Sequence, residues 1–186
     1  MINTFGTAAI GGYSAAIKLN NMTITSVTAL GNGMSNYTAQ NAGAKLPERI
    51  KEGFVAGFKL AAVIALIFAG LYWFGGEMFV RLFITDGNEA AIQTGVTFLK
   101  IVAPFYIVVA AKLIADGILR GVNRMKLFMT ATLVDLVTRV AFAALFAFVF
   151  HLGINGIWLS WPVGWFIGTA LSLFFYNRIK QFNFGI

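Results

Sequence analysis

Hydrophobic residues form four long, nearly uninterrupted stretches along the chain, at about 54–74, 96–119, 127–150 and 154–176. Each stretch has about the 20 residues that a helix needs to cross the roughly 30 Å hydrocarbon core of a bilayer. Shorter and less apolar segments separate them. The pattern therefore predicts four membrane-spanning helices.

A fifth stretch, at about 8–39, is more polar and is rich in Gly, Ala, Ser, Thr and Asn. Small residues allow membrane helices to pack closely, so we expect a fifth spanning helix that faces protein or water more than lipid. Its polar residues recur at steps of three and four and therefore share one helical face. This polar stripe consists of Ser14, Lys18, Asn21, Thr25, Thr28, Asn32 and Ser35.

The polar stripe has two interpretations. Hydroxyl and amide side chains hydrogen-bond neighbouring helices in membranes, but usually in small numbers. A stripe of this length would leave many groups unsatisfied against lipid. It therefore favours the wall of a water-accessible cavity, to which Lys18 would belong.

Composition places the chain in lipid. Hydrophobic residues make up 59% of it and charged residues 11%, against about 45–50% and about 25% in soluble domains. There is no cysteine and a single histidine, His151, and no Walker loop, catalytic triad or metal-binding cluster is recognisable. We expect an all-α integral membrane protein that is not an enzyme and has no cofactor or metal site.

The net charge of +7 is distributed unevenly over the connections. The basic residues lie in alternate loops and in the tail: Lys45, Arg49, Lys51, Arg120, Arg124, Lys126, Arg178 and Lys180. Because short loops rich in Lys and Arg remain cytoplasmic, this asymmetry predicts a multi-pass protein of the inner (cytoplasmic) membrane. Its C-terminus would be cytoplasmic and its N-terminus external. The charge is thus a topology signal and not a nucleic-acid footprint, although contact with anionic membrane lipid stays open.

Five charged residues lie deep within the predicted spans: Lys18 and four more on two neighbouring spans. One span contains Lys112, Asp116 and Arg120, which are spaced i, i+4, i+8 and so share one helical face. The next span contains Asp135 and Arg139, which are spaced i, i+4. A charge near the bilayer centre costs about 2.5–3.5 kcal/mol on insertion scales. The pattern predicts that Lys112, Asp116, Asp135 and Arg139 have partners inside the protein.

Counting from the basic ends of the two spans puts Lys112 and Asp135 at similar depth, roughly 12 Å. We therefore predict a cross-helix ion pair between them, flanked by Asp116 and Arg139. The four charges of this charge quartet sum to zero. Two roles are open: a neutral structural cluster, or a site where a carboxylate changes its partner or its protonation during transport. Pro104 and Pro162, also within spans, are expected to kink their helices.

Several stretches together resemble one family. They are FGTAAIGGYSAAIKLNNMTITSVTALGNGMSNYTAQNAGAKLPERIKEG, with its QNAGAKLPER turn, then RLFITDGNEAAIQTGVTFLKIVAPFY, GILRGVNRMK and GINGIWLSWPVGWFIGTALSLFFY. In this order they are similar to the multidrug and toxic compound extrusion (MATE) transporters. The resemblance implies a twelve-helix antiporter with two six-helix lobes and a cavity between them. This chain would supply five helices of the C-terminal lobe, helices eight to twelve.

The resemblance also implies a function. Such proteins expel small organic, mostly cationic compounds in exchange for sodium ions or protons. The N-terminal lobe and the first helix of this lobe, absent here, would be needed for transport. One branch of the family has an acidic coupling residue eleven positions before the arginine that matches Arg120, and that position is Val109. Other branches couple through an acidic residue in the first helix, which is absent here. The coupling ion, sodium or proton, therefore stays open, and its site is not identifiable from this chain.

Two alternatives remain beside multidrug efflux. One is an inactive fragment from a truncated or split gene, because part of a lobe has no opposite cavity wall. The other is a flippase for lipid-linked precursors within the same superfamily, which we would expect to have more cationic residues facing its cavity.

Overall fold

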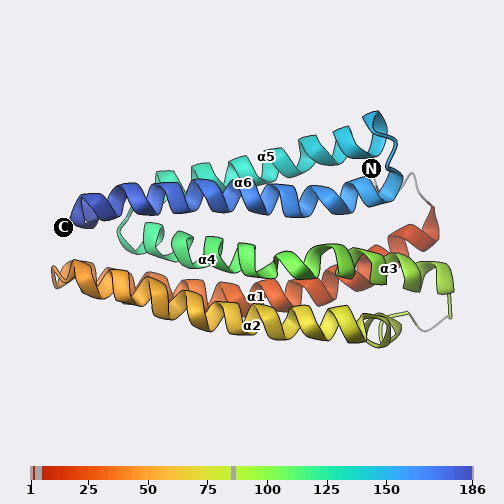
Figure 1. The fold of residues 1–186 in the computed structure, drawn as a ribbon, viewed down its shortest axis with the longest axis horizontal. Coiled ribbons are helices and arrows are strands. Elements are labelled where there is room, and N and C mark those ends of the chain that lie inside the picture. Colours follow the sequence, from red (N-terminus) through yellow and green to blue (C-terminus); the bar gives the residue numbers. More distant parts are fainter. Residues whose placement is uncertain (1, 3–5, 85–86, 186) are drawn as a thin grey trace.

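The structure is a computed structural model that describes residues 2, 6–84 and 87–185. This part of the chain is helical throughout, with no strand. Its elements are α1 (Thr7–Gly43), α2 (Pro47–Arg81), α3 (Glu89–Val102), η2 (Ala103–Phe105), α4 (Tyr106–Gly121), α5 (Met125–Ala144), η3 (Leu145–Val149), α6 (Gly153–Gln181) and η4 (Asn183–Gly185). The long helices run back and forth along one elongated bundle (Figure 1). The all-α fold is confirmed, and every predicted span is helical.

Four helical segments are long and apolar enough to cross a membrane: Pro47–Arg81, Glu89–Gly121, Met125–Val149 and Gly153–Gln181. Three of them contain a predicted apolar span and extend beyond it, and Met125–Val149 matches the predicted span 127–150 to within two residues at each end. Helix α1 is the longest, with 37 residues, but is too polar to join this group. It nevertheless runs beside α2 and α4, with which it packs (Figure 1).

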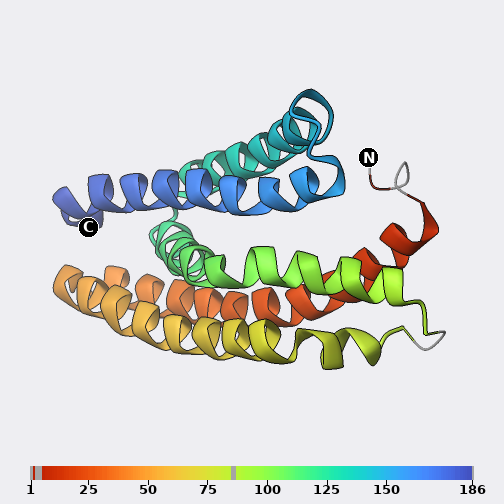
Figure 2. The ribbon, with the colours of Figure 1, turned by 45° about the vertical axis from the view of Figure 1, so that its right-hand side comes forward.

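The two prolines act differently. At Pro104 the chain leaves the α-helix for the short 3-10 turn η2, and α3 and α4 differ in direction on either side of it (Figure 2). Proline has no N–H and its ring clashes with the preceding turn, which explains the break. At Pro162, by contrast, α6 stays helical from Gly153 to Gln181.

Helix α4 is the centre of the bundle. It packs against α1, α2, α5 and α6, and Figure 2 shows α5 and α6 as a pair on one side of it, with α1 and α2 on the other. Ten of the 16 residues of α4 are buried, against six of the 35 residues of α2. Side chains of α4 therefore face protein, whereas α2 presents apolar side chains outward.

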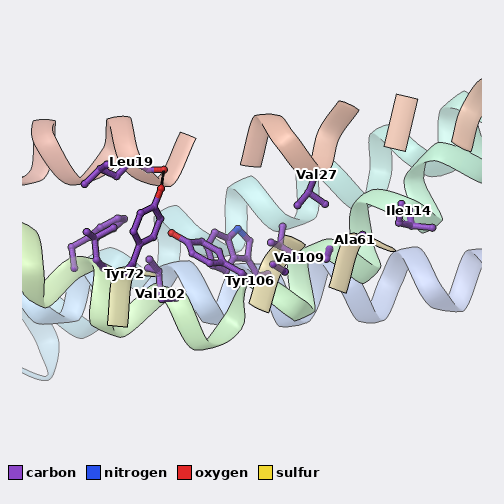
Figure 3. Close-up of a cluster of buried hydrophobic side chains, with 14 of the residues drawn as sticks. Leu19, Val27, Ala61, Tyr72, Val102, Tyr106, Val109 and Ile114 are labelled. Atoms are coloured by element: carbon purple, nitrogen blue, oxygen red, sulfur yellow. Dashed lines mark hydrogen bonds between the residues drawn. The ribbon is translucent and has the colours of Figure 1, made fainter. Parts of the chain in front are cut away.

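The core between α1, α2 and α4 combines apolar packing with a few polar contacts. The Tyr72 hydroxyl donates a hydrogen bond of 2.8 Å to the backbone carbonyl of Leu19 (Figure 3). The backbones of α1 and α4 also come into direct contact, since a Cβ on Gly31 would lie 2.7 Å from the Leu113 carbonyl oxygen. Gly117 faces the Gly31 carbonyl in return. The small residues of α1 thus serve the close packing that the sequence predicts.

Candidate functional site

The buried end of the charge quartet lies on α4. Lys112 Nζ is 2.6 Å from Asp116 Oδ2, and the two residues are 4% and 1% exposed. The other carboxylate oxygen, Oδ1, accepts a hydrogen bond of 2.6 Å from the Ser172 hydroxyl on α6. Both oxygens of Asp116 are therefore satisfied inside the protein, which makes a carboxylate tolerable at this depth.

The second half of the quartet lies on α5 and is less enclosed. Arg139 Nη2 donates a hydrogen bond of 3.0 Å to Asp135 Oδ1. The guanidinium also lies over the ring of Trp161, 4.5 Å from its centroid. Its Nε has no hydrogen-bond partner within the part of the chain that the structure describes. Arg139 thus keeps an unused donor beside a partly buried ion pair.

The predicted ion pair between Lys112 and Asp135 is wrong. Each lies in an ion pair with the charged residue four positions along its own helix, and no contact within 4.0 Å joins the two. Helix α6 lies between them: a Cβ on Gly168 would be 2.9 Å from Lys112 Cε and 2.8 Å from Asp135 Cβ. The two pairs do come together in space, but Gly168 separates them. The i, i+4 spacing already satisfies each charge within its helix.

Arg120 contacts a different helix from the other charged residues of α4. Although it shares a helical face with Asp116, its side chain does not pair with that carboxylate. Its Nη1 donates a hydrogen bond of 3.0 Å to Asn32 Oδ1 on α1, and its guanidinium lies 5.3 Å from the centroid of the Phe128 ring. This contact links α4 to the polar stripe.

The polar stripe lies on the open face of α1. Its members Ser14, Lys18, Asn21, Thr25 and Asn32 are exposed, and Thr28 and Ser35 are half-buried. The opposite face, with Ala16 and Val27 at its centre, is fully buried. Among the described helices, the stripe forms one hydrogen bond to another helix, from Arg120 to Asn32. The stripe therefore does not hold these helices together.

One end of the stripe borders a cavity of about 460 Å³, and Ser14 and Lys18 line it. Phe83, beyond the end of α2, closes the cavity on the other side, with its ring centroid 5.4 Å from Lys18 Nζ. No group of three or more His, Cys, Asp or Glu side chains that could hold a metal ion occurs in residues 2, 6–84 and 87–185.

Charge also differs between the two ends of the bundle. The α1–α2 connection, the α4–α5 connection and the C-terminus lie at the same end (Figure 1). The basic residues at or near this end are Lys45, Arg49, Lys51, Arg124, Lys126, Arg178 and Lys180. At the opposite end, Arg81 forms ion pairs of 2.8 Å with Glu77 and with Glu89. The unpaired positive charge is thus concentrated at one end.

A family profile described as MatE matches residues 1–145 of the chain. The chain belongs to the MatE family. Among curated proteins, the MatE chain is 27% identical over 184 residues to the "Probable multidrug resistance protein YpnP" of Bacillus subtilis (strain 168). The match covers 98% of this chain and 40% of that protein. The resemblance that the sequence motifs indicate is confirmed.

Solved MATE structures have the same fold as this chain. A "multidrug resistance MATE family transporter of the MOP superfamily" in an inward-facing conformation superposes with a TM-score of 0.87 and 15% identity, over 94% of this chain and 40% of that one. A MATE "in complex with MaL6" superposes with a TM-score of 0.90 and 15% identity, over 97% and 41%. The MatE chain is therefore a multi-pass membrane protein that spans about 40% of the length of these relatives.

Proposed function

We propose that this MatE chain works as part of a secondary transporter that moves organic, mostly cationic compounds out across the cytoplasmic membrane. The described helices would be helices eight to twelve, in the C-terminal lobe. The name of the B. subtilis relative and the MATE fold support multidrug efflux. Because the chain covers about 40% of its relatives, transport would require an N-terminal lobe and a preceding helix to form the opposite wall of the cavity.

The observation that carries this proposal is the exposed polar stripe on α1. The helix packs one face against α2, α3 and α4 and leaves hydroxyl, amide and ammonium groups on the other. These groups would be costly against lipid, where no water satisfies them. We infer that they line the water-filled pathway between the lobes. Carriers built from repeats bind their substrates in such a pathway and rock around it.

The charge quartet is proposed as the site where a cation is coupled to transport. Protonation of Asp116, or sodium binding at its oxygens, would weaken the attraction to Lys112. Because Asp116 also binds Ser172 on α6, a change of charge on this one carboxylate would act on the contact between two helices. The equivalent of the acidic coupling position known in one branch of the family is Val109, which is buried in the apolar core. That position offers no carboxylate in this chain, whereas the quartet offers two within the spans, Asp116 and Asp135.

The orientation follows from the charge difference between the two ends. The basic end, with the C-terminus, is proposed to face the cytoplasm, since short loops rich in Lys and Arg are retained there. The end with the Arg81 ion pairs would then be external.

An efflux assay on the complete native protein tests the proposal. Cells or proteoliposomes loaded with a fluorescent aromatic cation would be given a sodium gradient or a proton gradient in separate runs. We expect export that depends on one gradient and that N21L/T25L abolishes without loss of protein from the membrane. If removal of the gene blocks envelope synthesis but does not make the cells sensitive to drugs, the result favours the flippase. If there is no export under either gradient, the result favours the inactive fragment.

A further inference from the structure

A second site lies far from the polar stripe, at the basic end of the bundle. A cavity of about 670 Å³ forms there between the first turn of α5, the last turns of α6 and the C-terminal turn η4. Its lining residues are Asn123, Arg124, Met125, Lys126, Leu127, Phe175, Arg178, Ile179, Phe182, Phe184 and Gly185. Three of these are cations and none is a carboxylate.

The cations of this basic pocket are not neutralised by the rest of the described chain. Arg124, Lys126 and Arg178 are exposed and take part in none of the ion pairs among the described residues. Two exposed cations elsewhere do pair with acids: Lys51 lies 2.6 Å from Glu48, and Arg81 lies 2.8 Å from Glu77 and from Glu89. The basic pocket therefore offers a concentrated and unsatisfied positive charge.

The C-terminal turn holds one wall of the basic pocket in place. Phe184 is buried, with its ring centroid 6.1 Å from that of Tyr176, although its φ of 62° lies in the left-handed region. Gly185 follows at φ 74°, and a Cβ there would lie 2.8 Å from Arg124 Nη2. The turn thus brings the backbone against the guanidinium at a position whose left-handed φ favours glycine.

The floor of the basic pocket is apolar and continues onto the outer surface of the bundle. Leu127 and Phe175 are half-buried in it, and the Phe182 side chain at its rim is 73% exposed. Met125 at the start of α5 is 45% exposed as well. An apolar surface of this kind at the end of a membrane helix is suited to contact with acyl chains and with the glycerol backbone of a lipid.

We propose that the basic pocket binds an anionic phospholipid from the leaflet that surrounds this end of the bundle. The phosphate would lie among Arg124, Lys126 and Arg178, which offer the charge and the N–H donors that a phosphate needs. The glycerol and upper acyl chain would cover Leu127, Phe175 and Phe182. A free phosphate ion would leave this apolar floor in water, which favours the lipid as occupant. Clusters of Lys and Arg beside a membrane helix recognise acidic headgroups in this way.

Native mass spectrometry of the complete protein, released from nanodiscs, tests the site. Nanodiscs of phosphatidylglycerol are compared with nanodiscs of phosphatidylcholine, for the native protein and for R124Q/R178Q. The matched control is K45Q/R49Q, which also removes two cations from the same end of the bundle but outside the basic pocket. Thermal stability in lipid-free detergent verifies that each variant is folded.

We expect retained phosphatidylglycerol adducts in the native protein and the control, and a loss on the order of 10- to 30-fold in R124Q/R178Q. Inorganic phosphate should not displace the lipid. Three results would overturn the proposal. They are equal retention of the two lipids by the native protein, an equal loss of phosphatidylglycerol in R124Q/R178Q and K45Q/R49Q, and displacement of the lipid by inorganic phosphate alone. An equal loss would assign the effect to general surface charge.

Discussion

The hydroxyl of Ser172 donates a hydrogen bond of 2.6 Å to the carboxylate of Asp116, 56 residues earlier in the chain. This contact joins α6 to the central helix α4 at a point where both side chains are buried. Together with the ion pair to Lys112, it makes Asp116 the most fully satisfied charge of the quartet. Asp116 therefore contributes to the stability of the bundle and is also part of the proposed coupling site.

Replacement of Asp116 should destabilise the protein strongly. In D116N the ammonium of Lys112 stays buried without its counter-ion, and the loss of one partner of a buried pair costs about 3–5 kcal/mol. S172A removes one hydrogen bond to a charged group, which is worth about 1.5–3 kcal/mol. We expect a lower midpoint of thermal unfolding in detergent for both variants, with the larger drop in D116N. An unchanged midpoint in D116N would contradict the buried pair.

A double variant separates the structural role of the quartet from a role in transport. In K112M/D116L the two charges are replaced by apolar side chains, a change that is often neutral or stabilising for a buried pair. We expect thermal stability close to that of the native protein, with export lost because no carboxylate remains on α4. If K112M/D116L were stable and still exported the substrate, the Lys112–Asp116 pair would have a structural role only.

Close packing of α1 on α4 predicts a large difference between two neighbouring glycines. A Cβ on Gly31 would lie 2.7 Å from the Leu113 carbonyl oxygen, whereas a Cβ on Gly33 would meet nothing within 4 Å. Overpacking of this kind typically costs about 1–3 kcal/mol, so G31A should unfold at a lower temperature than the native protein. G33A is the matched control on the same helix and should be neutral or slightly stabilising, because alanine is the better helix former.

Accessibility of the polar stripe can be measured directly, because the chain has no cysteine. In single-cysteine variants of the complete protein, N21C and T25C should react with a membrane-impermeant thiol reagent. V27C, on the fully buried face of α1, should not react. L66C should not react either, although Leu66 is 58% exposed, because we expect lipid around it. Unreactive N21C and T25C would mean that the stripe does not face water.

The hydrogen bond from Tyr72 to the Leu19 carbonyl should contribute measurably to stability. Y72F removes the hydroxyl that donates over 2.8 Å between α2 and α1. A hydrogen bond of this type contributes about 0.5–1.5 kcal/mol, so we expect a modest fall in the unfolding midpoint. Y37F removes the bond from Tyr37 to the Arg49 carbonyl, which is accessible to water, and serves as the control. A fall of the same size in Y37F would show that burial of the Tyr72 bond adds nothing.

Much of the fold can be predicted from the pattern of hydrophobic residues. The four apolar stretches match membrane-length helices because backbone groups in lipid must be satisfied within a helix. The ends are less predictable: α2 extends from Pro47 to Arg81, well beyond the expected 54–74. Its outer turns are amphipathic or charged, so hydrophobicity does not mark them.

The candidate site is predicted only in part. The spacing of Lys112, Asp116, Asp135 and Arg139 identifies four charges that need partners, and the structure does bring the two pairs together. Ser172 and Gly168, which complete the arrangement, carry no such signal, because a serine and a glycine in an apolar helix are ordinary. The incorrect prediction of an ion pair between Lys112 and Asp135 has the same origin. It is based on their depth in the membrane, which does not indicate that α6 lies between α4 and α5.

The sequence by itself determined that this chain is a bundle of membrane helices with a polar stripe on the first and a neutral charge quartet on two others. These features depend on local periodicity and on the cost of polar groups in lipid, and both can be read along the chain. Only the tertiary structure decided that α4 is the central helix, that α6 lies between the two ion pairs, and that the polar stripe stays uncovered by the other described helices. These relationships depend on how helices far apart in sequence pack, and the local hydrophobic pattern does not specify that packing.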